Sequence, residues 1–359
     1  MEAERTKKDT LNNVSPFQLN AQYVLLEDTK SNLNHDSITY MNKKGILFHA
    51  DCLNVLSGIR NDSIDLVFTD PPFNLGKDYD TTAYSDRMSA EAYKKWCRMW
   101  MSELVRVLRP GGTLAVYSWP RWIIEIGSQL HTIPELEYRS LISLKMKSGF
   151  PIRGRIHPSN YCIIYYTKRG AKPTFNIVRY RTPTCRHCGK EIRDYGGYRK
   201  KFEKFEDEER IPWIQISDFW EDTRPARQDK SRKTKINELP VHIPERIILM
   251  ASNEKDVVLD IFGGGGSTYQ AAQMHNRHWI GCEIGNINSC LSRFATLWGK
   301  EEEEKPPRKV RACLKPRFLK ILLEKRRSEG FHPIQNVKPL TNGSLLKKDM
   351  MSKSRVFGY

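Results

Sequence analysis

The chain has 359 residues, with 59 Lys and Arg against 42 Asp and Glu, which gives a formal net charge of +17. With 39% hydrophobic and 10% aromatic residues it can bury a core, so a globally disordered protein is excluded. No apolar run approaches the roughly 20 residues of a membrane helix, and the polar start lacks the apolar segment of a signal peptide. We therefore expect a soluble, non-secreted protein. Its eight scattered Cys favour a reducing compartment over a disulfide scaffold.

The positive charge is concentrated in two blocks of the chain. Residues 145–235 contain 23 Lys and Arg against 11 Asp and Glu, and residues 300–359 contain 16 against 7. The rest of the chain is slightly acidic, with 20 against 24. Two basic blocks on a near-neutral body are typical of a protein that binds a polyanion, most simply nucleic acid. A basic tail that only adds solubility is the alternative.

Apolar runs alternate with amphipathic stretches through most of the chain, which predicts an α/β fold with a mainly parallel sheet. Strands are expected at residues 46–48, 64–69, 113–117, 161–166, 257–261 and 279–283. The spacing of apolar residues predicts a helix over 90–108, capped by Ser89 and ended by the Pro110–Gly112 turn. A second helix is expected over 267–274.

A glycine-rich loop joins the strand at 257–261 to the helix at 267–274 and reads Asp-Ile-Phe-Gly-Gly-Gly-Gly-Ser-Thr over residues 260–268. Glycines let backbone N–H groups approach a ligand closely, and Glu283, ending the next strand, is placed to accept from ribose hydroxyls. The loop therefore predicts a cofactor that contains a nucleoside. It fits neither a dinucleotide fingerprint, whose third glycine would fall on Thr268, nor a phosphate loop, which needs a Lys. A flexible turn beside a Glu at the core edge is the alternative.

A second motif, Asp70-Pro71-Pro72-Phe73, follows the strand at 64–69. Ligands of open α/β sheets bind at this end of the strands. The prolines fix the backbone, so the Asp70 carboxylate and the Pro71 carbonyl can be held as two hydrogen-bond acceptors beside the Phe73 ring. Two acceptors beside an aromatic ring suit an exocyclic amine on a flat base. An ordinary Asp-Pro turn is the alternative.

At these two motifs the sequence resembles the DNA amino-methyltransferases, which transfer a methyl group from S-adenosylmethionine to N6 of adenine or N4 of cytosine. That family has an Asp/Ser/Asn-Pro-Pro-aromatic catalytic motif and a Phe-x-Gly-x-Gly cofactor loop. The catalytic motif comes early here and the cofactor loop late, with a basic block between them, as in the permuted β group of the family. The resemblance covers about residues 45–170 and 236–298. It implies a Rossmann-like S-adenosylmethionine-dependent methyltransferase fold with a seven-stranded, mainly parallel sheet and a circularly permuted motif order.

The resemblance also implies roles for individual residues. The catalytic set is Asp70, Pro71, Pro72 and Phe73. The cofactor-binding set is Asp51, Asp260, Phe262, Gly264, Gly266, Ser267, Thr268 and Glu283. Asp51 matches the acid that contacts the cofactor adenine, and a turn Asp ahead of a helix explains it nearly as well.

One large permuted domain with an insert and two extensions is expected. The insert mixes Arg and Lys with Tyr, Phe and Trp, which are side chains suited to phosphates and bases. The basic C-terminal appendage, residues 300–359, either adds DNA affinity or docks on the body. The expected parts are a loosely ordered arm (1–40), the catalytic domain (41–144 and 236–299), the last sheet strands with an inserted target-recognition region (145–235), and a basic C-terminal appendage (300–359).

The resemblance implies site-specific methylation of double-stranded DNA. A base inside a duplex cannot reach such a pocket, so it must be flipped out, with Phe73 as its stacking partner. Asp70 favours adenine N6, because cytosine-N4 enzymes more often have Ser there; cytosine N4 is the near alternative. An RNA or protein-amide methyltransferase and a non-catalytic DNA-binding protein are the further alternatives. The chain has no Pro-Cys dipeptide, which argues against methylation of cytosine carbon 5.

No metal site is expected. Cys185 and Cys188 resemble half of a zinc ribbon, but tetrahedral zinc needs four ligands and the next Cys is Cys282. The expected location is the cytoplasm, associated with the nucleoid, or the nucleus in a eukaryote, where Lys305–Lys309 could act as a nuclear signal. No membrane partner is expected. Dimers are common in the group, and a restriction–modification context would add a cognate nuclease that the sequence does not identify.

Overall fold

The computed structural model describes residues 38–76, 87–145, 153–154, 156, 159–181, 187–188, 213–221, 238–298 and 306–320. The chain divides into two units, residues 1–33 and 34–359, and all described residues belong to the second unit. The expected N-terminal arm lies outside the described residues except for its last three residues, which belong to a strand. Most of the expected target-recognition region and the end of the appendage also lie outside the described residues.

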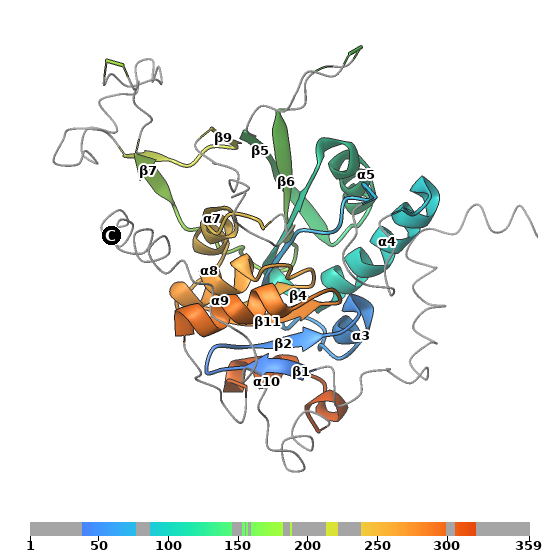
Figure 1. Ribbon diagram of the computed structural model, residues 1–359, viewed down its shortest axis with the longest axis vertical. Helices are drawn as coiled ribbons and strands as arrows, with labels where there is room; N and C mark the ends of the chain where they lie inside the picture. The colour runs from blue at the N-terminus through green and yellow to red at the C-terminus, as the bar shows by residue number, and fades with distance from the viewer. Residues whose placement is uncertain are drawn as a thin grey trace, which may run out of the picture. The chain divides into compact units, whose positions relative to one another are not determined.

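A nine-stranded sheet dominates the second unit (Figure 1). Its strands are β1 (Ile38–Met41), β2 (Gly45–His49), β3 (Ile64–Thr69), β4 (Leu108–Ser118), β5 (Leu136–Lys145), β6 (Asn160–Lys168), β9 (Phe219–Trp220), β10 (Val257–Asp260) and β11 (His278–Glu283). They lie in the order β1-β2-β11-β10-β3-β4-β6-β5-β9. The strands from β2 to β4 in this order are parallel, and β6 is antiparallel to both of its neighbours.

The sheet contains all six strands that the sequence predicts. β10 and β11, from the late part of the chain, lie between β2 and β3, from its early part. This permuted order places the glycine-rich loop after β10 next to the Asp-Pro-Pro-Phe motif after β3. The expected number of seven strands rises to nine because the edge strands β1 and β9 extend the sheet.

Helices cover both faces of the sheet (Figure 1). They are α3 (Cys52–Ser57), α4 (Ala90–Val107), α5 (Pro120–His131), α7 (His242–Ala251), α8 (Ser267–Met274) and α9 (Asn288–Trp298). On β11, Trp279 stacks with Tyr269 of α8, with ring centroids 5.0 Å apart. Cys282 lies three residues further and therefore on the other face, where its thiol contacts the Ala50 carbonyl ahead of α3. The contacts group α3, α4 and α5 on one face and α7, α8 and α9 on the other.

The helix α4 begins where the sequence predicts and ends differently. The Ser89 hydroxyl accepts a hydrogen bond of 3.2 Å from the Ala92 N–H and caps the helix. The helix ends at Val107, one residue before the predicted end, and the predicted turn Pro110–Gly112 instead belongs to β4. Gly111 has a φ of +76°, and the pairing of β4 with β3 is irregular at this point. The turn residues therefore form a bulge within a strand.

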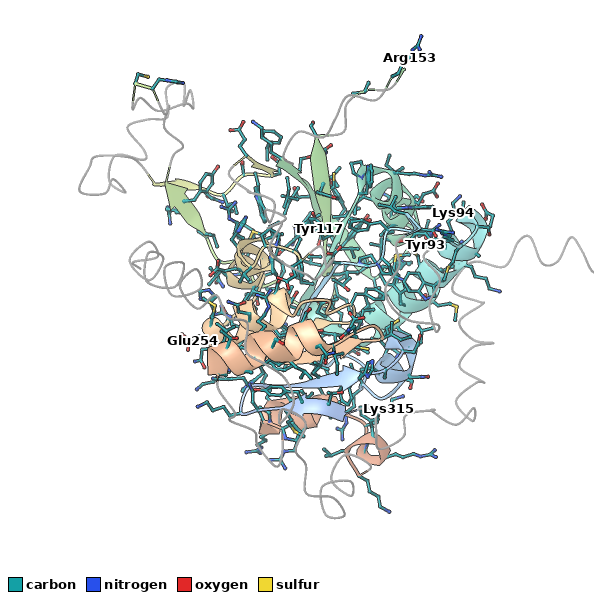
Figure 2. The ribbon with its side chains drawn as sticks, viewed as in Figure 1. Tyr93, Lys94, Tyr117, Arg153, Glu254 and Lys315 are labelled. Carbon is teal, nitrogen blue, oxygen red and sulfur yellow. The ribbon has the colours of Figure 1, made fainter. Side chains whose placement is uncertain are left out.

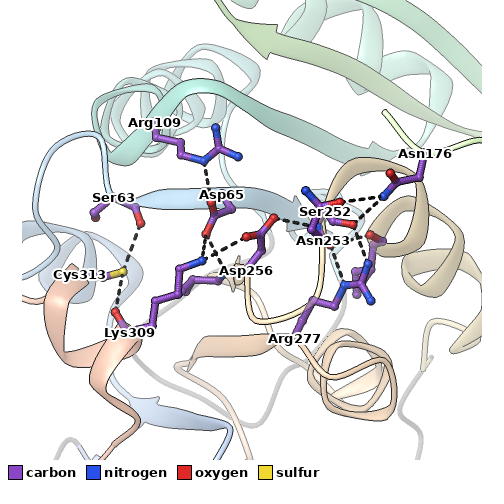
Figure 3. A network of polar contacts seen from close by, with 12 residues as sticks. Ser63, Asp65, Arg109, Asn176, Ser252, Asn253, Asp256, Arg277, Lys309 and Cys313 are labelled. Carbon is purple, nitrogen blue, oxygen red and sulfur yellow. Dashed lines mark hydrogen bonds and ion pairs between the residues drawn. The ribbon is translucent and has the colours of Figure 1, made fainter. Parts of the chain in front are cut away.

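The first part of the expected appendage docks on the body of the fold, beside the large sheet (Figure 3). In α10 (Arg308–Cys313), the Lys309 ammonium lies 3.5 Å from the Asp65 carboxylate and 3.1 Å from the Asp256 carboxylate. These acids mark the amino ends of β3 and β10. Phe318 follows, and its ring packs 5.3 Å from that of Phe48. Lys309 thus covers the amino ends of β3 and β10, opposite to the predicted site, while Phe318 packs against β2.

A separate two-stranded sheet forms the base of the insert. It pairs β7 (Arg179–Arg181) with β8 (Trp213–Gln215), on either side of residues 182–212 in the chain. The Arg246 guanidinium of α7 lies over the rings of Tyr180 and Trp220, at 5.7 and 5.1 Å. The base of the insert is therefore fixed to the body. None of the described helices has the length and apolar character needed to cross a membrane.

Candidate active site

The carboxyl ends of four neighbouring parallel strands meet at one edge of the sheet. Asp51 follows β2, Asp70 follows β3, Asp260 ends β10 and Glu283 ends β11. A hydrogen bond of 3.3 Å from the Thr69 hydroxyl to the Asp260 carboxylate joins the two motifs directly. The sheet therefore assembles the predicted catalytic and cofactor-binding residues into one candidate site.

Glu283 holds the glycine-rich loop with both carboxylate oxygens. Its Oε2 accepts from the Gly264 N–H at 2.7 Å, and its Oε1 accepts from the Gly285 N–H at 2.6 Å. Each oxygen keeps a second lone pair for a further donor. Glu283 thus lies beside the loop, and its contact with the ribose of a cofactor stays a prediction.

Arg293 of α9 supports the loop from behind and is not predicted by the sequence. Its guanidinium donates to the Gly265 carbonyl at 2.5 Å, to Gln270 Oε1 at 2.5 Å and to Glu238 Oε2 at 2.8 Å. The side chain is buried, so its charge is neutralised inside the protein by Glu238. An Arg on the buried face of an apolar helix is the sequence signal that could have identified it.

Asp260, Ser267 and Thr268, which the sequence assigns to the cofactor, make their described contacts within the protein. Asp260 is buried and accepts from the Thr268 hydroxyl at 2.6 Å and from the Phe262 N–H at 3.0 Å. The Ser267 hydroxyl donates to the Leu239 carbonyl at 2.5 Å. We therefore expect these three side chains to position the loop, while direct contact with a cofactor stays a prediction.

Burial raises the pKa of the Asp260 carboxyl from 3.8 to about 6. The folded protein therefore binds this proton more tightly than the unfolded chain, and the associated stability is present below about pH 4 and is lost as the pH rises through about 6. The loss amounts to about 3 kcal/mol. We expect Asp260→Asn to remove this pH dependence in the free energy of unfolding, measured with urea at about pH 4 and about pH 7. If the free energy of unfolding changes equally with pH in the wild type and the variant, the raised pKa does not belong to Asp260.

Two glycines of the loop adopt left-handed conformations, with φ of +48° at Gly264 and +80° at Gly266. A Cβ at Gly266 would lie 2.7 Å from the Cys290 sulfur, whereas a Cβ at Gly264 would meet no atom within 4 Å. We expect Gly266→Ala to lower the free energy of unfolding by about 2–4 kcal/mol, through strain and overpacking, and Gly264→Ala by only about 1–2 kcal/mol. Denaturant unfolding of both variants measures the difference. Equal losses would show that the Cys290 contact does not restrict this position.

Asp51 and Phe262 connect the site to the helices around it. Asp51 Oδ1 accepts from the Leu53 N–H at 2.9 Å and caps α3, so the alternative explanation from the sequence is confirmed. Its contact with a cofactor adenine stays a prediction. The Phe262 ring packs against Trp96 and Trp100 of α4, at centroid distances of 5.5 and 5.6 Å. The helix after the catalytic motif therefore also supports the cofactor loop.

Two aromatic donors hold the backbone of the Asp-Pro-Pro-Phe motif. The Tyr93 hydroxyl donates to the Pro72 carbonyl at 2.7 Å, and the Trp122 indole N–H donates to the Phe73 carbonyl at 2.6 Å. Within the described part of the chain, the Pro71 carbonyl accepts no hydrogen bond. The motif is thus fixed by its later carbonyls and retains the Pro71 acceptor that the sequence predicts.

Two tyrosines that the sequence does not predict complete an aromatic cluster with Phe73. The ring centroids of Tyr117 (β4) and Tyr161 (β6) lie 6.2 and 5.9 Å from that of Phe73, and 5.2 Å from each other. Burial and, secondly, the nearby Asp70 carboxylate raise the pKa of both hydroxyls. Both tyrosines are therefore neutral at neutral pH. Tyrosines in strands usually pack in a core, so the sequence alone gives them no functional signal.

A family model matches most of the catalytic domain. The model describes the N6/N4 DNA methylases and covers residues 64–287, which include both motifs and the insert between them. The chain belongs to the DNA methylase family. The family resemblance of the two motifs is thereby confirmed.

Among curated proteins, the chain is similar to Type II methyltransferases of bacteria. It is 40% identical to M.BamHI of Bacillus amyloliquefaciens over 267 residues, which cover 73% of this chain and 61% of that protein. It is 32% identical to M.HpaI of Haemophilus parainfluenzae over 236 residues, which cover 65% of this chain and 69% of that protein. The chain thus spans less than two thirds of the length of the first relative.

The fold of the chain is that of a solved methyltransferase. The superposition on the PvuII DNA methyltransferase, described as cytosine-N4-specific, has a TM-score of 0.53 and covers 82% of this chain and 96% of that chain. The sequence identity is 17%, so this likeness shows the fold alone. The expected fold of an S-adenosylmethionine-dependent methyltransferase is confirmed.

The sequence also raised a zinc half-site at Cys185 and Cys188. Cys188 is exposed, and Cys185 lies outside the described residues. Among the residues that the structure describes, no group of three or more His, Cys, Asp or Glu is placed to hold a metal ion. This pair therefore stays untested.

Proposed function

We propose that this DNA methylase transfers a methyl group from S-adenosylmethionine to the exocyclic amine of a base flipped out of double-stranded DNA, with N6 of adenine as the first candidate. The contact between the two motifs at the ends of β3 and β10 carries the proposal. It supports a site in which the Asp70 and Pro71 acceptors lie beside the glycine-rich loop, with Glu283 one strand further along the same edge. A donor methyl and an acceptor amine held at neighbouring strand ends can be aligned for transfer.

The residues around the glycine-rich loop fit this cofactor. Glu283 retains lone pairs for two ribose hydroxyls, and the open space beside Gly264 lets the backbone approach a ligand closely. Asp51, at the next strand end, is the candidate for the adenine contact. S-adenosylmethionine supplies a methyl group that is already activated on a sulfonium, so the protein has mainly to align and improve the acceptor.

Asp70 and Pro71 are placed to improve the acceptor amine. The lone pair of an exocyclic amine is conjugated into the base, which makes the nitrogen a weak nucleophile. Hydrogen bonds from its two N–H groups to the Asp70 carboxylate and the Pro71 carbonyl favour rehybridisation and stabilise the positive charge that develops on nitrogen. The Asp70 carboxylate can also accept the proton that the amine loses.

The choice between adenine and cytosine depends on separate observations. Asp70 in the first motif position favours adenine N6, through the resemblance of the motif. The PvuII methyltransferase, which shares the fold, is described as cytosine-N4-specific, and this favours cytosine N4 as the second candidate. Both bases present an amine beside a ring nitrogen, so Asp70 and Pro71 would serve either reaction in the same way.

Double-stranded DNA is the proposed partner. The two basic blocks supply charge for phosphates, and the first of them interrupts the catalytic domain between the two motifs. The similarity to Type II methyltransferases supports a restriction–modification context with a cognate nuclease, and a place in the bacterial cytoplasm. A homodimer is part of the same proposal, through the resemblance to the permuted group.

Mass spectrometry of nucleosides tests the proposed function. The protein is incubated with S-adenosylmethionine and either DNA or RNA, and each nucleic acid is digested to nucleosides. We expect N6-methyldeoxyadenosine from DNA alone; N4-methyldeoxycytidine would instead establish the second candidate. Methylated nucleosides from RNA alone, or none from either nucleic acid, would contradict the proposal.

A further inference from the structure

In the aromatic cluster of Phe73, Tyr117 and Tyr161, the Tyr117 hydroxyl has no role in the methyl transfer as proposed above. Tyr117 is 6% exposed and lies on β4, the strand that pairs with β3 ahead of the catalytic motif. In the described part of the chain its hydroxyl has no hydrogen-bond partner. The hydroxyl oxygen is not among the fully buried, unpartnered polar atoms of the described residues, so it keeps some exposure and can bond a ligand that offers an acceptor. Tyr117 is the penultimate residue of β4, and Figure 2 shows it well apart from Lys315 of the docked segment.

The hydroxyl is near the group proposed to bind the amine. The Asp70 carboxylate contributes, after burial, to the raised pKa of Tyr117 and of Tyr161, so both hydroxyls lie within range of its charge. Tyr117 is therefore a neutral donor at physiological pH. The site thus presents an obligate acceptor, Asp70, beside a donor, Tyr117.

An acceptor beside a donor matches one edge of the bases. Adenine and cytosine carry an exocyclic amine next to a ring nitrogen that accepts hydrogen bonds, N1 in adenine and N3 in cytosine. Guanine and thymine carry a carbonyl and a ring N–H at the corresponding positions, which would oppose Asp70 with an oxygen. Asp70 and Pro71 can take the amine but cannot donate to the ring nitrogen. A donor for that nitrogen must come from another residue.

We propose that the Tyr117 hydroxyl donates a hydrogen bond to the ring nitrogen adjacent to the target amine, and that Tyr117 is a specificity-determining residue of the base pocket. The proposal rests on the proposed function. It makes the pocket selective for the amine-and-nitrogen edge that adenine and cytosine share. Tyr161 and Phe73 then contribute ring contacts to the same base.

The test combines a side-chain change with the matching change in the base. Tyr117→Phe removes the hydroxyl and keeps the ring of the cluster. The target site is first mapped, and its adenine is then replaced with 1-deazaadenine, which has C–H in place of N1 and keeps the amine. If the mapped base is cytosine, 3-deazacytosine takes this place. Tyr138→Phe, at a half-exposed position of β5, removes a tyrosine hydroxyl elsewhere and serves as the control.

The measured quantity is kcat/KM for the four combinations of enzyme and base. On the natural base, we expect Tyr117→Phe to lose about tenfold, as for one hydrogen bond, and Tyr138→Phe to keep the wild-type value. On the deaza base, wild type and Tyr117→Phe should differ by less than about twofold, since the hydroxyl has lost its acceptor.

Three results would overturn the proposal. The first is that Tyr117→Phe lowers kcat/KM by the same factor on both bases. The second is that it leaves kcat/KM on the natural base unchanged. The third is that the wild-type enzyme has the same kcat/KM on the natural and the deaza base. Absence of methyl transfer by the wild type to any DNA base would reject the proposed function itself and this inference with it. The wild-type comparison of the two bases needs no variant and therefore does not depend on the folding of Tyr117→Phe.

Discussion

Replacing Asp70 with alanine is expected to lower the rate constant of methyl transfer roughly 100- to 1,000-fold, while the affinity for S-adenosylmethionine stays within about threefold of the wild-type value. The two quantities separate because the Asp70 carboxylate serves the acceptor amine, whereas Glu283 and the glycine-rich loop serve the cofactor. Single-turnover transfer of a tritiated methyl group to DNA measures the first quantity. Calorimetric titration with the cofactor measures the second.

Two further variants sharpen this prediction. Asp70→Asn keeps one acceptor oxygen, and Asn occupies this position in part of the family that the motif resembles, so its loss should be smaller than that of alanine. Glu137→Ala removes a carboxylate of β5 that is 41% exposed and should keep the full rate. Full activity of Asp70→Ala would contradict the role of the carboxylate. Joint loss of transfer and of cofactor binding would show that Asp70 supports the cofactor loop instead.

Ending the chain after Lys305 is expected to lower the free energy of unfolding by about 5 kcal/mol or more. The truncation removes Val310 and Leu314, which are fully buried, and Phe318, which is 7% exposed. Burial of each such side chain stabilises a protein by about 1.5–3 kcal/mol. A loss of this size is a large part of the about 5–15 kcal/mol that stabilises a typical domain. Urea unfolding measures it as a lower midpoint.

The reference for this experiment is a chain that ends after Lys320, which retains every described contact of the docked segment. Lys309→Met serves as a second control, because it removes only the ion pairs to Asp65 and Asp256. Since Lys309 is 45% exposed, this change should cost no more than about 1 kcal/mol. If the two truncated chains unfold at the same urea concentration, residues 306–320 do not stabilise the catalytic domain.

The sequence predicts most of the sheet because its central strands are buried on both faces. All six residues of β3, for example, are buried, and such a short apolar run bounded by polar residues is a clear strand signal. β5 gives no such signal, because the middle of the strand is exposed at Tyr138, Arg139 and Leu141. Its buried residues are Leu136, Ile142 and Leu144. The bulge at Pro110–Gly112 is mistaken for a helix stop for a related reason. Glycine and proline mark a break in a pattern without saying which element continues.

The candidate site is predictable where its chemistry lies in short contiguous motifs. Asp70 and Glu283 are identified because each ends a predicted strand, and parallel strands end at the same edge. Tyr117 and Tyr161 are missed because their significance arises only when separate strands come together. Arg293 carries a sequence signal, as an Arg on the buried face of a helix, but its partner in the loop appears only in the fold. The sequence likewise cannot show that Asp260, unlike Glu283, is buried beneath the glycine-rich loop.

The most direct test of the account is the distance between the target amine and Asp70. A crystal structure with DNA that contains the mapped site and a non-reactive cofactor analogue would measure it. We expect a base flipped out of the duplex, with its amine nitrogen about 2.7–3.2 Å from both the Asp70 carboxylate and the Pro71 carbonyl. A target base that stays stacked in the duplex, or an amine that contacts neither oxygen, would contradict it.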